Sequence, residues 1–417
     1  MGLVREAQVL SGSAVVVVAA INFYKKPGFT YCLILLSLIF IFSVSTIQAE
    51  DLPPAQIYIH DFNNGITVYT GVFALNKDVS LDTSAYFKYT VDVINPSFGG
   101  GGEGGGTGNG NEAGKGIPKG LNKIAAISGA STAATSGGAG QNTRNELTAG
   151  ITHNFNNIVG IEMYYDYSKE NHYTSNTPTI TLKKDLFEKN TTLTLAYSQN
   201  IDQVYGKYMT QKEGRDTYNY FFGITQVISP VTVARVGYSR SKENGFTSEG
   251  VRLVPVDGAT QASCTDKSLT CVDEEFPNNR SRDAYLFGVN HYFKDGIFAI
   301  SAIRFTFRRY TDDWNIHSLT EDFEYYKYLS DQDILRLNFR YYDQSKAYFV
   351  KTTYTTTDLL KSTSPQLEAF NSQRFGIKLS HQLEDFPGSL IEGKYEYYTE
   401  SINVHANIFM LGIRLSF

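Results

Sequence analysis

Apolar and polar residues alternate along most of the chain, in segments of roughly ten residues that begin near Gln56. In the segment 191–198, for example, Leu193, Leu195 and Tyr197 are separated by threonine or alanine. Successive side chains of a β-strand point to opposite faces, whereas a helix repeats its faces about every 3.6 residues. The period of two therefore predicts strands with one apolar and one polar face.

Short turns and longer polar connections alternate between these segments. The longer connections span about 95–140, 244–281 and 345–369. Barrels of the bacterial outer membrane have this asymmetry, with short turns on the periplasmic side and long loops outside, whereas a soluble sandwich has no reason for it. The short turns contain turn-forming residues and lie at 76–78, 156–157, 188–190, 229–230, 294–296, 330–332 and 385–388.

The number of strands follows from the number of turns. Seven short turns join fourteen strands, a strand at 55–61 precedes the first of these, and a strand that ends at Phe417 follows the last. Bacterial barrels of this kind have an even number of strands. We therefore expect an all-β fold, a transmembrane antiparallel up-and-down β-barrel of about sixteen strands, with fourteen and eighteen as alternatives.

The final strand has an apolar residue at every second position up to the end of the chain. An amphipathic last strand that ends in Phe is similar to the signal read by the outer-membrane barrel-assembly machinery, which we expect as a partner during biogenesis. The alternative is a last strand that merely happens to end the chain. The alternating residues are Phe409, Leu411, Ile413, Leu415 and Phe417.

The N-terminal segment 1–49 has the features of an export signal. Lys25 and Lys26 precede an apolar run at 32–44, and small or polar residues then lead to Ala49. This order is typical of a signal peptide, and the run is shorter than the ~20 residues that a spanning helix needs. We therefore assign 1–49 to an N-terminal extension with a signal peptide and 50–417 to the barrel, with no plug domain between them.

Composition and charge narrow the classes of function. Aromatic residues make up 14% of the chain, with 29 Tyr and 27 Phe, which suits strands better than helices. The formal net charge of -5 argues against a nucleic-acid partner, which would need a basic face. Cys264 and Cys271 lie in a polar segment and predict a small disulfide loop in an oxidising compartment. A thiol metal site is the alternative, but no histidine lies beside them.

Two blocks of the sequence carry a family resemblance. The chain reads RYTDDWNIHSLT at 309–320 and FRYYDQSKAYF at 339–349, and shorter pieces match at 128–131 and 190–193. These stretches resemble an uncharacterised family of outer-membrane barrels, domain of unknown function 3570. The resemblance implies an outer-membrane barrel in a Gram-negative bacterium but no reaction. The loop motif of the first block contains Asp312, Asp313, Trp314 and His317, and we expect Trp314 to anchor the membrane interface.

Three consecutive predicted strands place charged residues on their inward faces. Turn positions predict that Glu324 lies across from Arg336, with Arg304 close by. Opposite charges paired across strands are favourable, and facing lipid they would cost about 2–4 kcal/mol each. They either select polar or anionic solutes along an aqueous path or form a structural ladder in the wall. This lumen charge ladder contains Arg304, Arg308, Asp322, Glu324, Arg336 and Arg340.

Catalytic and cofactor motifs are not legible in the sequence. His317 and Ser318 are adjacent, and adjacent residues of a strand point to opposite faces. The glycine-rich segment 99–120 lacks the spacing of a phosphate-binding loop and is typical of a flexible external loop. The histidines do not have the spacing of metal ligands. We therefore expect no enzymatic activity, no cofactor and no metal site.

The sequence thus predicts an outer-membrane barrel that conducts small polar solutes. A barrel of about sixteen strands is wide enough for an aqueous channel unless side chains or loops fill it. The alternative is a structural or partner-binding barrel of the envelope, which sheathes or supports a redox protein or binds a partner at the surface. The remaining expected partner is the lipid of the outer membrane.

Overall fold

The computed structural model describes residues 55–63, 66–96, 142–156, 158–384, 386 and 389–414. The predicted signal segment and the predicted connection at 95–140 lie almost entirely outside these residues, as do the last three positions of the chain. Among the described residues, no helix is both long and apolar enough to cross a membrane.

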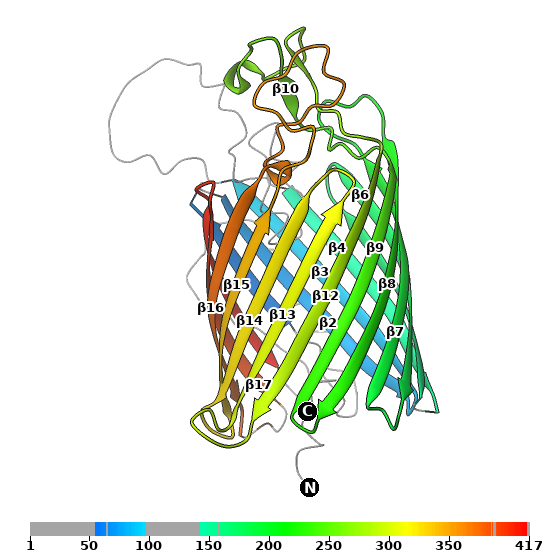
Figure 1. The fold of residues 1–417 in the computed structure, drawn as a ribbon, viewed down its shortest axis with the longest axis vertical. Coiled ribbons are helices and arrows are strands. Elements are labelled where there is room, and N and C mark those ends of the chain that lie inside the picture. Colours follow the sequence, from blue (N-terminus) through cyan, green and yellow to red (C-terminus); the bar gives the residue numbers. More distant parts are fainter. Residues whose placement is uncertain are drawn as a thin grey trace, which may run out of the picture.

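Sixteen antiparallel strands form a closed barrel, which confirms the predicted fold class and strand number (Figure 1). Two further strands, β10 (Leu253–Pro255) and β11 (Cys271–Asp273), form a small separate sheet. The barrel strands are β1 (Ala55–Phe62), β2 (Ile66–Ser80), β3 (Thr83–Pro96), β4 (Asn142–Phe155), β5 (Val159–Lys169), β6 (Tyr173–Leu186), β7 (Thr191–Val204), β8 (Glu213–Ser229), β9 (Thr232–Gly245), β12 (Asn279–Phe293), β13 (Ser301–Asp312), β14 (His317–Tyr328), β15 (Asp333–Gln344), β16 (Phe370–Gln382), β17 (Leu390–Glu400) and β18 (His405–Arg414).

Each barrel strand pairs with the strand that precedes it in the wall, so the barrel is of the up-and-down type. Strand β9 pairs with β12 because β10 and β11 lie outside the wall. Strand β1 closes the barrel against β18, with Ala55 opposite Ile413 and Phe62 opposite Ala406. Closure leaves no edge strand, so the backbone groups of the wall bond to each other, as a spanning sheet requires.

Alternation along the strands gives the wall two different faces. Large apolar residues on the outer face are half exposed, such as Leu195 (52%) and Val236 (49%). Their chain neighbours have the opposite parity and point into the barrel. Threonine, serine, glycine and charged residues predominate there, apart from an apolar cluster where β1, β2, β3 and β18 meet. An apolar outside and a polar inside are what a lipid-facing barrel needs.

The two ends of the barrel differ in the length of their connections. At one end, which we call the turn end, neighbouring strands are joined by short turns; Phe187, Glu188 and Lys189 all have positive φ in the β6–β7 turn. At the other end, the loop end, residues 246–278 join β9 to β12 and residues 345–369 join β15 to β16. These two long connections, with β10 and β11, stand above the barrel wall in Figure 1.

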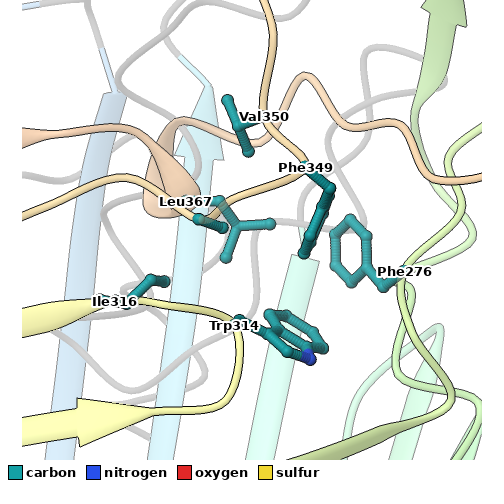
Figure 2. Packing of buried hydrophobic residues seen from close by; sticks show 7 residues of the cluster. Phe276, Trp314, Ile316, Phe349, Val350 and Leu367 are labelled. Atoms are coloured by element: carbon teal, nitrogen blue, oxygen red, sulfur yellow. The ribbon is translucent and has the colours of Figure 1, made fainter.

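A compact structure with its own apolar core covers part of the loop end; we call residues 246–278 and 345–369 the cap. Phe276 from the first connection meets Phe349 from the second at a ring distance of 5.7 Å. Trp314, at the tip of the β13–β14 hairpin, packs on Phe349 at 5.3 Å (Figure 2). The whole cluster consists of Phe276, Trp314, Ile316, Ala347, Phe349, Val350 and Leu367. The cap is therefore a folded unit rather than two independent loops.

Candidate functional site: the inward face of the barrel

The structure places the predicted ladder residues together on the inward face of β13, β14 and β15. Arg304 lies directly opposite Glu324, and Asp322 lies directly opposite Arg340. The Nη1 atom of Arg304 is 3.4 Å from Oε2 of Glu324, and Nε of Arg340 is 3.5 Å from Oδ1 of Asp322. The side chains of Arg304 and Arg340 are 46% and 44% exposed, so water has access to these pairs.

The predicted register of β14 and β15 is wrong by two residues. Glu324 lies opposite Asn338, and Arg336 lies opposite Tyr326. The predicted turn at 330–332 is correct, since Tyr328 and Ile334 pair on either side of it, and this turn places Glu324 opposite residue 338 rather than 336. Arg336 still reaches Glu324 diagonally, with Nη1 3.7 Å from Oε1. The expected ion pair is thus present, but as a diagonal contact.

The charged face continues on β16 and β17, beyond the three strands for which the sequence predicts it. Arg374 Nη1 lies 3.8 Å from Glu396 Oε2, and Lys394 Nζ lies 3.0 Å from the same oxygen. Lys378 forms an ion pair with Glu392. The signal was present in the sequence, since these residues alternate with apolar ones as those of the ladder do. We call the inward face of β13 to β17 the charged wall.

Two arginines face the lumen without an acidic partner among the described residues. Arg308, on β13, lies under the ring of Tyr310 at 5.4 Å. Arg235, on β9, lies across β12 and donates a hydrogen bond from Nη2 to Oγ1 of Thr306 (3.2 Å). Gly288 allows this crossing, because a Cβ at that position would lie 2.6 Å from Nε of Arg235. The wall between β9 and β13 therefore carries positive charge that the ladder does not neutralise.

A hollow of about 270 Å³ lies beside Arg308 on the wall formed by β6 to β13. Small residues of β7 and β9 that point into the barrel, such as Ala196, Ser198 and Ser239, line it. Arg308 and Tyr310 form its other side. The hollow brings hydroxyl groups next to one of the uncompensated arginines, which is a suitable surface for a polar or anionic solute.

A second group of charged residues lies on β3 and β4 and was not predicted from the sequence. Nε of Arg144 lies 3.0 Å from Oδ2 of Asp92, whose side chain is fully buried. Thr70 donates a hydrogen bond to Asp92, and Lys88 lies 2.8 Å from Glu146. Single charges on separate strands form no local pattern, because their pairing depends on the register of β3 against β4.

The motif loop of β13 and β14 is structural. Asp312 accepts a hydrogen bond from the backbone N–H of Ile316 (2.8 Å) and pairs with Arg280. Asp313 accepts a hydrogen bond from the backbone N–H of Ser281 (2.9 Å), which ties the hairpin to β12. Asn315 adopts the positive φ of 66° that the tight turn requires. These contacts hold the hairpin tip below the cap.

Trp314 is not the membrane anchor that the sequence suggested. It is 3% exposed, its Nε1 donates to the carbonyl of Asn279 (2.9 Å), and Arg280 lies over its ring at 4.1 Å. It belongs to the core of the cap (Figure 2). His317 is exposed and Ser318 is buried, so the two neighbours do not act together.

The cap contains a buried charged group, in contrast to the exposed pairs of β13 to β15. Arg252 Nη1 lies 2.5 Å from Glu249 and 3.5 Å from Glu274, and the side chains of Arg252 and Glu274 are 3% and 0% exposed. Ser362 donates a hydrogen bond to Oε1 of Glu274 (2.6 Å) from the other connection. Burial raises the pKa of Glu274 to about 7, against the opposing effect of Arg252.

The two cysteines and the end of β18 are also placed by the structure. Cys264 and Cys271 form a disulfide within the cap and pack against Leu253.

On β18, Phe409 and Leu411 face outward and are 48% and 39% exposed, and Ile413 shares their parity. Leu415 and Phe417 lie outside the described residues. Within those residues, no group of three or more His, Cys, Asp or Glu is arranged to hold a metal ion.

A closed wall of sixteen strands, apolar outside and polar inside, defines an outer-membrane-type β-barrel. The family model described as "Protein of unknown function (DUF3570)" matches residues 45–208 and 205–409. Because these matches cover most of the chain, the protein belongs to this family, as its sequence motifs predicted. No curated protein matches the chain.

Several solved structures of outer-membrane proteins are similar to this chain. The siderophore receptor PirA from Pseudomonas aeruginosa matches with 8% identity and a TM-score of 0.40, over 85% of this chain and 57% of the receptor. A bacterial polysaccharide outer membrane secretin matches with 7% identity and a TM-score of 0.43, over 88% and 98%. A loop-deletion mutant of OmpT, an outer membrane protein of Vibrio cholerae, matches with 7% identity and a TM-score of 0.41, over 88% and 97%. The chain spans little more than half of the siderophore receptor.

Proposed function

We propose that this protein is a conduit for small polar solutes across the outer membrane, with a preference for anions. The observation that carries the proposal is the pair of lumen-facing arginines, Arg235 and Arg308, which have no acidic partner among the described residues. Fixed cations beside an aqueous path raise the local concentration of anions and repel cations. A sixteen-stranded wall is wide enough to enclose such a path.

The polarity of the inner face supports the same proposal. Charged pairs on β13 to β15 are partly exposed, as the 46% and 44% of Arg304 and Arg340 indicate. Water therefore reaches this part of the inner face. In this proposal the loop end faces the exterior and the turn end faces the periplasm, as in other barrels with short turns on one side.

Conductance in planar lipid bilayers tests the conduit directly. We expect stepwise currents from the reconstituted protein, and a reversal potential in a KCl gradient that indicates preference for chloride. Arg308→Glu should shift this potential toward potassium, because it reverses the charge beside the hollow. Arg308→Lys, which keeps the charge, is the matched control and should retain the preference.

The conduit fails if folded protein inserts into bilayers and carries no current. The anion preference fails separately if current flows but Arg308→Glu and Arg308→Lys give the same reversal potential. Folding of each variant is checked by circular dichroism, which must show a β-rich spectrum.

A second candidate function, binding of a protein partner, is favoured by the cap. Two connections that share an apolar core and a disulfide form a defined surface at the loop end. Chemical cross-linking on intact cells tests this candidate, since a partner at the cap should be captured through Lys351 or Lys267, whose side chains are 52% and 47% exposed. Cross-linked products that contain this chain alone would count against it.

A further inference from the structure

The cap contains a pocket of about 500 Å³ between its two connections. Thr260 and Gln261 line it from the first connection, and Thr352, Thr353, Thr363 and Glu368 line it from the second. Pockets of about 300–1,000 Å³ are the usual size of small-molecule sites. The pocket lies outside the barrel wall, so its contents do not depend on passage through the lumen.

The walls of this pocket are held in place by hydrogen bonds between the two connections. The backbone N–H of Asp257 donates to the carbonyl of Tyr354 (3.0 Å), and Glu275 and Lys361 exchange two backbone hydrogen bonds of 3.0 Å. The hydroxyl of Tyr354 donates to the carbonyl of Ser362 (2.8 Å), and Tyr354 is only 5% exposed. A site that is formed before its ligand arrives loses little entropy on binding.

The charges around the pocket are mostly neutralised within the cap. Arg252 is held by Glu249 and Glu274, and Lys351 pairs with Asp358. Glu368 is exposed at the pocket and has no ion-pair partner among the described residues. A strongly anionic ligand would be repelled by this carboxylate, whereas a neutral ligand can use it as a hydrogen-bond acceptor. The pocket therefore favours a neutral ligand over an anionic one.

Hydroxyl groups give the pocket its recognition chemistry. The side chains of Thr352, Thr353 and Thr363 make no hydrogen bond to another described residue, so they can both donate to and accept from a ligand. The carboxylate of Glu368 can accept from ligand hydroxyls, and Pro255 and Pro365 offer apolar ring faces. Hydroxyls together with apolar C–H faces are the chemistry of a sugar.

From this combination we infer that the cap pocket binds a neutral oligosaccharide, with one or two sugar rings inside it. The pocket is at the loop end, so in the proposed orientation the sugar comes from the cell exterior. The site would stand even if the barrel conducts nothing, because none of its lining residues belongs to the barrel wall.

Saturation-transfer difference NMR on the full chain in detergent micelles tests the site. The probes are maltose, lactose, cellobiose and trehalose, each at millimolar concentration. We expect a transfer signal for at least one of them. Thr353→Trp should reduce that signal at least tenfold, because the indole fills the pocket.

The matched control is Leu359→Trp, which adds the same side chain to the same connection. Leu359 is 86% exposed and does not line the pocket, so its variant should keep the signal. Glu368→Gln should weaken the signal several-fold without abolishing it. Should Thr353→Trp fail to fold, Thr352→Trp fills the same pocket from the neighbouring position.

Absence of a signal for all four disaccharides would overturn the inference. A signal that survives pocket filling would also overturn it, since the sugar would then bind elsewhere, such as in the lumen. Loss of the signal in both Thr353→Trp and Leu359→Trp would likewise contradict a pocket site. These outcomes leave the conductance experiment unaffected, so the two proposals can fail independently.

Discussion

The charged wall and the cap both use arginine–carboxylate pairs, but in opposite surroundings. In the wall, Arg304 and Arg340 are about half exposed, so water screens their pairs with Glu324 and Asp322. In the cap, Arg252 and Glu274 are at most 3% exposed. Exposed pairs are worth about 0–1 kcal/mol, whereas removal of one partner from a buried pair costs about 3–5 kcal/mol. The cap therefore depends on its buried pair for stability, whereas the exposed pairs of β13 to β15 contribute little.

The largest expected effect is on the cap. Arg252→Met should destabilise the closed cap by about 3–5 kcal/mol, because it leaves Glu249 and Glu274 without their shared cation. Hydrogen exchange of residues 246–278 measures this as a loss of protection, while the barrel strands remain protected. The matched variant in the wall is Arg304→Met, which should leave the protection of β13 and β14 within about 1 kcal/mol. Equal losses of protection in the two variants would mean that the buried pair of the cap and the exposed pair of the wall contribute equally to stability.

A smaller effect is expected from pH on the stability of the cap. Burial raises the pKa of Glu274 from 4.5 to about 7. Between these two pH values Glu274 is protonated in the closed cap and ionised in the opened cap. The stability of the closed cap should therefore be greatest below pH 4.5 and decrease as the pH rises to about 7. Protease cleavage within 345–369 should be faster at pH 8 than at pH 5, relative to an unfolded peptide control. Glu274→Gln should remove the dependence; an unchanged dependence in that variant would assign it to another group.

The smallest effect is expected from exchanging a pair within the wall. The double variant Arg304→Glu with Glu324→Arg keeps the pair and the net charge of the inner face. Because the pair is exposed to water, we expect a change in thermal stability that corresponds to less than about 1 kcal/mol, and an unchanged ion preference. Thermal stability is measured by the heat-induced loss of the β-rich circular dichroism spectrum. Ion preference is measured by the reversal potential. A large destabilisation would mean that water is excluded from this pair as it is from the buried pair of the cap.

Much of the wall could be predicted from the sequence, because each strand carries its own pattern. The alternation in 191–198 and the apolar parity of Phe409 and Leu411 determine which face meets lipid, whatever the neighbouring strand is. The same alternation predicts correctly that the ladder residues share the inward face. The register of β14 against β15 differs from the prediction by two residues, although the turn at 330–332 is the predicted one.

The cap could not be predicted, because its contacts join residues that are far apart in the chain. Trp314 at a strand end has the same sequence signature whether it faces lipid or a core. Its burial follows from Phe276 and Phe349, which come from two different connections. The cap pocket likewise combines Thr260 with Glu368, and no local pattern relates these positions.

Single-cysteine labelling in reconstituted membranes tests most directly whether the barrel has a water-accessible inner face and an apolar outer face. Thr306 points into the lumen, and its neighbour Phe307 has the opposite parity and faces outward. A charged, membrane-impermeant thiol reagent should modify Thr306→Cys rapidly and Phe307→Cys very slowly, with the unsubstituted protein as background. Rapid modification of Phe307→Cys together with a protected Thr306→Cys would contradict the account.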